Sequence, residues 1–126
     1  MNPFQDLKPV GFLDRDELEE LQKDGANIPD EMHQKIVRYL KSGVTLTWSP
    51  GFSEDLLSPG KIIGSDTTLS DGEWIWPNSL TYYVESYHIG LPQEFLKTME
   101  ANGYRVGFLR RLRVIFSNTA QGHRRN

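Results

Sequence analysis

The chain contains no cysteine, and this absence removes several classes of function. There can be no disulfide framework, no thiol nucleophile and no zinc site with thiolate ligands. A protein without cysteine suits a reducing compartment, which favours a cytoplasmic location. No apolar run approaches the roughly 20 residues that a membrane-spanning helix needs. The first ten residues lack a positive n-region and an apolar core, so we expect no signal peptide.

A strong charge imbalance is also missing. The formal net charge of −3 predicts neither a polyanion partner nor a membrane surface as partner. Residues 1–60 nevertheless carry eleven acids and six bases, whereas residues 61–126 carry six acids and eight bases. A late basic strip could contact phosphates, but pairing with the acidic N-terminal helix or solvation of an edge strand explains it better. The arginines of this strip are Arg105, Arg110, Arg111, Arg113, Arg124 and Arg125.

The sequence carries no recognised catalytic or nucleotide-binding motif. Gly-x-x-x-x-Gly-Lys and Gly-x-Gly-x-x-Gly, which cradle phosphates, are absent, and so is Gly-x-Ser-x-Gly. The histidines His33, His88 and His123 are not spaced as ligands on one helix. Glu85 and His88 are three residues apart on a predicted helix, yet such a pair needs no metal. We therefore expect no cofactor and no metal, and we assign no catalytic residue.

What the sequence does contain is a single domain over residues 1–126, long enough for a core without cross-links. Residues 1–12 have two prolines and no periodicity, which predicts a loose N-terminal arm. Residues 117–126 are polar and predict a tail. Helices are predicted over 14–25, where Asp14 and Glu17 fit a capping box, and over 29–43.

Two segments predict β-strands in the middle of the chain. Residues 44–48 alternate, with Val44, Leu46 and Trp48 on one face. We expect the Ser-Pro-Gly triplet at 49–51 to end this strand and residues 52–60 to form a loop. A short strand is predicted at 61–63, and polar residues then lead into a hairpin.

The clearest pattern lies in residues 69–104. Asp71-Gly72 predicts a type I′ turn, because both central residues of that turn need positive φ. After it, Trp74 and Trp76 point to one face of a strand and Ile75 to the other.

Two helices are predicted after this strand, over 77–90 with Gly90 as terminator and over 92–102. The first has an apolar stripe made by Leu80, Tyr83, Val84 and Tyr87. The second buries Phe95, Leu96 and Met99. Residues 104–116 fit a strand or a helix, and their aromatic and β-branched content favours a strand. This order of elements predicts an α+β fold, with a small, mostly antiparallel sheet of about three to four strands packed against helices.

The aromatic side chains exceed what the helical stripes can use. Tyr82 lies off the stripe of its helix and Ile75 lies opposite the tryptophans, so we expect part of this group to be exposed. Exposed aromatics beside arginine are typical of binding hot spots, although a large aromatic core is an equal alternative. The candidate residues for binding a protein partner are Trp74, Ile75, Trp76, Tyr82, Tyr83, Arg110 and Arg111.

Residues 70–104 combine Asp-Gly-x-Trp-x-Trp-Pro at 71–77, Tyr-Tyr-Val at 82–84 and Leu-Pro-x-x-Phe at 91–95. With these motifs the chain resembles an uncharacterised family of small bacterial cytosolic proteins, over about residues 36–106. The resemblance implies no catalytic residues. In size and α+β character such proteins are similar to the immunity partners of bacterial toxins, which is an analogy of fold type.

Three functions follow in order of preference. The first is a non-catalytic protein-binding module, with a toxin-neutralising partner as one form of it. The second is a nucleic-acid-associated protein that uses the arginine-rich C-terminal segment. The third is an enzyme with a spaced site around Glu85, His88 and loop carboxylates such as Glu54 and Asp55. Binding to another protein is thus the expected interaction, and nucleic acid and membrane are not.

Overall fold

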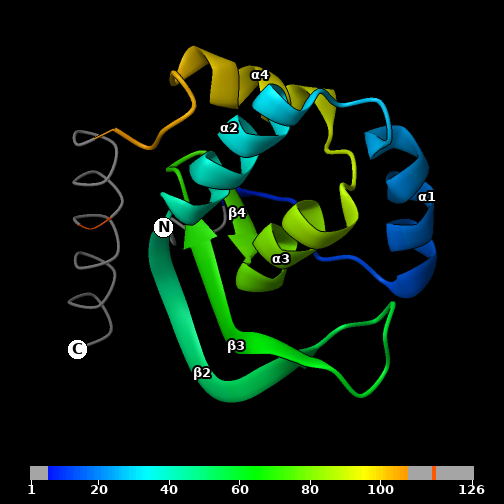
Figure 1. The fold of residues 1–126 in the computed structure, drawn as a ribbon. Helices are drawn as coiled ribbons and strands as arrows, with labels where there is room; N and C mark the ends of the chain where they lie inside the picture. Colours follow the sequence, from blue (N-terminus) through cyan, green and yellow to red (C-terminus); the bar gives the residue numbers. More distant parts are fainter. Residues whose placement is uncertain (1–5, 108–114, 116–126) are drawn as a thin grey trace, which may run out of the picture.

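The computed structural model describes residues 6–107 and residue 115 (Figure 1). Within these residues the chain forms four helices and one open, four-stranded mixed sheet, so the predicted α+β fold is confirmed. None of the described helices is long and apolar enough to cross a membrane. The elements in chain order are β1 (Lys8–Pro9), α1 (Arg15–Gly25), α2 (Asp30–Lys41), β2 (Val44–Glu54), β3 (Ile62–Ser70), β4 (Trp74–Pro77), α3 (Asn78–Tyr87) and α4 (Gln93–Ala101).

The strands are ordered β1-β4-β3-β2, so β2 lies at one edge of the sheet. The pairs β2–β3 and β3–β4 are antiparallel, as the sequence predicts, and β1 pairs with β4 in parallel. Leu69 of β3 lies opposite Trp76 of β4, which places both side chains on the face that the helices cover.

The helices begin where local sequence signals predict. Asp14 and Glu17 form a capping box before α1, with each side chain accepting a hydrogen bond from the backbone N–H of the other residue at 2.8 and 3.2 Å. α3 does not end at Gly90, however, because His88 already adopts the left-handed conformation with φ of 53°. Gly90 instead packs against α1, where its N–H donates to the carbonyl of Leu21 at 2.8 Å.

The predicted loose arm is wrong for residues 8–10. The N–H groups of Lys8 and Val10 each donate to a carbonyl of the β4 region at 2.9 Å, and Val10 is buried. Gly11 follows with φ of 83°, and its backbone lies so close to Leu80 of α3 that a Cβ would clash. A two-residue strand carries no periodicity, so the sequence gives no sign of it.

The predicted end of β2 is also wrong. The strand continues through Pro50 and Gly51 to Glu54, because register shifts between Ser49 and Phe52 and between Ser53 and Glu54 absorb the extra residues. Pro50 is tolerated because β2 is an edge strand. Its partner β3 includes the polar stretch before Leu69, and Figure 1 shows the two strands bending together beneath α3.

The turn between β3 and β4 is not type I′. Gly72 has φ of 95°, but Asp71 is not in a positive-φ conformation. Asp71 is fully buried, and its carboxylate accepts the N–H groups of Glu73 and Trp74 at 2.8 and 2.7 Å and the hydroxyl of Tyr39. A side-chain-stabilised turn replaces the expected backbone turn.

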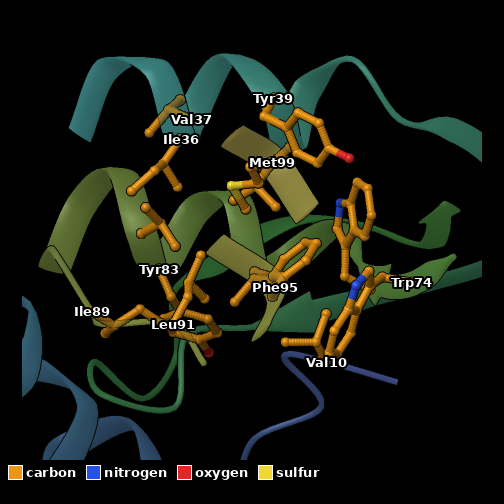
Figure 2. Packing of buried hydrophobic residues seen from close by; sticks show 14 of the residues in the cluster. Val10, Ile36, Val37, Tyr39, Trp74, Tyr83, Ile89, Leu91, Phe95 and Met99 are labelled. Atoms are coloured by element: carbon orange, nitrogen blue, oxygen red, sulfur yellow. The ribbon is translucent and has the colours of Figure 1, made fainter. Parts of the chain in front are cut away.

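The core lies between the sheet and the helices α2, α3 and α4 (Figure 2). The ring of Phe95 on α4 lies 5.1 Å from that of Trp74 and 5.4 Å from that of Trp76, and Tyr39 of α2 lies 6.1 Å from Trp76. Aromatic pairs at these distances add stability beyond the area they bury. Both tryptophans of β4 therefore belong to the core.

Residues 104–116, for which strand and helix were both possible, fall largely outside the described residues. The predicted tail at 117–126 falls wholly outside them.

Candidate functional site

The residues predicted to bind a partner separate into three groups. Trp74, Trp76 and Tyr83 are at most 5% exposed, so they offer no surface to a partner. Ile75 and Tyr82 are partly exposed. Arg110 and Arg111 lie outside the described residues. The aromatic residues predicted to bind a partner thus belong mostly to the core, and the exposed apolar surface lies elsewhere.

Three tyrosines of α3, Tyr82, Tyr83 and Tyr87, form what we call the tyrosine cluster, and it holds the loop after β2. The hydroxyls of Tyr82 and Tyr87 donate to one carboxylate oxygen of Asp55, each at 2.7 Å. The other oxygen accepts the N–H groups of Leu57 and Ser58 at 2.8 and 3.1 Å. Asp55 is fully buried, and a buried carboxylate needs this number of donors.

Tyr83 adds a second attachment beside the first. Its hydroxyl donates to the carbonyl of Glu54 at 3.2 Å and accepts the N–H of Leu56 at 2.9 Å. Its phenol is therefore bonded to the chain on both sides of Asp55. The tyrosine cluster fixes the end of β2 against α3.

The protonation states of this cluster follow from its contacts. Burial of Asp55 tends to raise its pKa, but the hydrogen bonds from Tyr87, Tyr82 and two backbone N–H groups outweigh burial and hold the pKa below its ordinary value. The hydrogen bond to Asp55 raises the pKa of Tyr87, and burial raises that of Tyr83. Asp55 is therefore an anion at neutral pH, and Tyr83 and Tyr87 are neutral. Because both carboxylate oxygens are occupied, the arrangement is suited to holding the chain in place.

The exposed aromatic surface lies on the β2–β3 hairpin. Trp48, Phe52 and Ile62 are 69%, 70% and 61% exposed, and we call them the hairpin surface. Trp48 lies opposite Thr67 and Phe52 opposite Ser65, so the two aromatic side chains share one face. The sequence placed Phe52 in a loop and Trp48 beside Val44 and Leu46 because it did not reveal the register shifts of β2.

An open groove of about 470 Å³ lies between this hairpin and α3, and we call it the hairpin groove. Phe12, from the segment before α1, lines the groove and is half exposed, and Phe52 and Leu56 line it and are exposed as well. Hydroxyl groups of the strands and α3 line it as well. Its polar and charged lining residues are Ser53, Glu54, Asp66, Thr67, Thr68, Ser79 and Tyr83.

The residues considered for an enzyme site do not converge. Glu85 contacts Lys41, with 3.3 Å between carboxylate oxygen and Nζ. His88 stacks on His33 with 3.8 Å between ring centroids, and Nε2 of His33 lies 2.7 Å from the carbonyl oxygen of Val84. In the part of the chain that the structure describes, no group of three His, Cys, Asp or Glu side chains could hold a metal ion.

No protein-family model matches the chain, and neither a curated protein nor a solved structure matches it. The resemblance drawn from residues 70–104 stays a prediction. The function has to be argued from the geometry of the hairpin.

Proposed function

We propose that this chain is a non-catalytic protein-binding module that contacts its partner through the hairpin surface. The observation that carries the proposal is the exposure of Trp48, Phe52 and Ile62 on one hairpin. Single exposed apolar residues are common on proteins, but several on one element are typical of interaction sites. Tryptophan is also the residue type most enriched among binding hot spots.

The attachment of the hairpin supports the same function. The tyrosine cluster ties the end of β2 to α3 through Glu54, Asp55 and Leu56. A binding element that is already held in place loses less conformational entropy when the partner binds. Neutralisation of a toxin is a narrower form of this function, and it stays a prediction.

The hairpin is less suited to nucleic acid. Exposed aromatic side chains can stack on bases, but Glu54 and Asp66 lie beside Phe52 and would repel phosphates. Arg110 and Arg111, on which a nucleic-acid function would depend, lie outside the described residues.

Site-specific photocrosslinking in the native cell tests the proposal. A benzoylphenylalanine placed at Trp48 or Phe52 should give one dominant crosslinked product. The same group at Lys97, an exposed residue of α4, serves as the matched control. Equal products from all three positions, or none from the hairpin, would contradict the proposal.

Once the partner is purified, its affinity gives a second measurement. Trp48→Ala should weaken the complex by about 2 kcal/mol, roughly 30-fold, if Trp48 is a hot spot. An unchanged Kd would remove Trp48 from the binding site.

A further inference from the structure

The hairpin groove has a definite chemical character. Phe12 and Phe52, from two separate segments, line it with exposed aromatic side chains, and Leu56 adds an aliphatic group. Its charged lining residues in the described part of the chain are Glu54 and Asp66, both acidic. No described lysine or arginine lines it. A groove with aromatic walls and carboxylates matches a cationic, partly apolar group.

Both walls of the groove are held in place. Gly11, with its positive φ and its close approach to Leu80, fixes the segment that carries Phe12. Tyr83 bonds the backbone on either side of Asp55 and so fixes the wall that carries Glu54 and Leu56. The groove is therefore formed before a ligand arrives.

The carboxylates have room to accept a donor. Glu54 uses one oxygen to accept the N–H of Gly60, which leaves the second oxygen for a ligand. Asp66 is exposed at the groove. A planar guanidinium can stack on an aromatic ring and donate to two carboxylate oxygens at once, which an ammonium group does less well.

We propose that the hairpin groove binds an arginine side chain presented by an extended segment of the partner protein. This inference rests on the proposed binding function and names the chemistry of the partner. A second hollow of about 430 Å³ shares Phe12 with the hairpin groove. It is lined mainly by apolar residues, including Val10, Leu21 and Leu91. Because Gly11, Phe12 and Leu13 line both hollows, an apolar side chain near the arginine fits the second one.

A pair of capped peptides tests the inference without the partner. One is acetyl-Leu-Arg-Leu-amide, and the other has the neutral isostere citrulline in place of arginine. Amide NMR spectra of the full chain are followed up to about 10 mM peptide, which detects the millimolar affinity expected of so small a ligand. The arginine peptide should shift the signals of Phe12, Phe52 and Thr67, and the citrulline peptide should bind at least about threefold more weakly. Equal binding of the two peptides, or no shift, would overturn the inference.

Charge variants locate the contact. Asp66→Asn and Glu54→Gln should each weaken the arginine peptide by about threefold, as expected for exposed ion pairs. Glu100→Gln on α4 removes the same charge far from the groove and should leave the affinity unchanged. If replacing Arg110 and Arg111 by glutamine strengthened peptide binding, the occupant would be the chain's own segment, which would overturn the assignment to a partner.

The two proposals can fail separately. A crosslink from Trp48 together with no response to the arginine peptide would support the proposed binding function and overturn the inference that the groove binds arginine. An arginine-specific response together with no crosslink from the hairpin would leave a groove that binds arginine but would overturn its assignment to a protein partner.

Discussion

The strands β4 and β2 each carry two large aromatic side chains, and these have opposite environments. Trp74 and Trp76 are buried under Phe95 of α4, whereas Trp48 and Phe52 are about 70% exposed. Residue type alone does not decide burial. β4 is a central strand with helices on one face, whereas β2 is an edge strand that bends beneath α3 and holds Trp48 and Phe52 outside the core (Figure 1). Exposure of aromatics on an edge strand is the observation on which the proposed binding function rests.

The largest expected effect comes from comparing the stability of two tryptophan variants, one in each strand. Trp76→Ala should lower the free energy of unfolding by about 3–5 kcal/mol, because it leaves a cavity in the core. Trp48→Ala should change it by no more than about 0.5 kcal/mol. Urea unfolding followed by circular dichroism measures both. A similar loss for the two variants would mean that Trp48 is part of the core.

Gly11 follows β1, which pairs with β4, and it lines the hairpin groove together with Phe12. A substitution at Gly11 therefore tests how these two regions are connected. Gly11→Ala places a Cβ at positive φ and against Leu80, so it should cost about 1–3 kcal/mol of stability. Gly60→Ala is the matched control, since Gly60 also has positive φ but has open space around it. A cost at Gly11 no greater than at Gly60 would show that the contact with Leu80 does not matter.

The stability that the bonds between Asp55 and the tyrosine cluster provide should depend on pH. Because the pKa of Asp55 is lowered in the folded chain, its contribution to stability is fully present above about pH 4 and is lost as the pH falls through the folded pKa. Asp55→Asn should therefore destabilise the chain at pH 6, and this difference should shrink toward pH 2. Urea unfolding of both proteins at the two pH values gives the comparison. A difference independent of pH would contradict an ionised Asp55.

The smallest expected effect concerns one hydroxyl of the tyrosine cluster. Tyr82→Phe keeps the ring but removes a donor to Asp55, which should cost about 0.5–1.5 kcal/mol. Tyr104→Phe removes a hydroxyl from another partly exposed tyrosine and should cost less. Equal costs would indicate that the bond from Tyr82 to Asp55 adds nothing.

The features that the sequence predicts correctly are local. The capping box of α1, the alternation of Trp74, Ile75 and Trp76 and the buried face of α4 each depend on residues within about two turns or a few strand positions. The fold class follows from the order of these elements.

The features that the sequence misses depend on distant parts of the chain. The bulges that carry β2 past Pro50 are set by its pairing with β3, and the burial of Asp71 requires Tyr39 of α2. The hairpin groove brings together Phe12, Phe52 and Ser79 from three separate segments. The periodicity of one segment cannot indicate which residues of other segments lie beside it in the fold. Polar Asp55, which lies next to exposed Glu54, likewise gives no local sign that three tyrosines bond to this stretch.

The parallel pairing of β1 with β4 has a consequence for folding. Lys8 lies opposite Trp74, so this contact closes a loop of about 66 residues, whereas β3 and β4 meet through a short turn. Contacts between distant residues form more slowly than local ones. During synthesis, β1 has no strand to join until β4 has left the ribosome. Because β1 leads directly into Gly11 and Phe12, one wall of the hairpin groove can be completed only late in folding. The chain should therefore become competent for binding arginine only after most of it has been made.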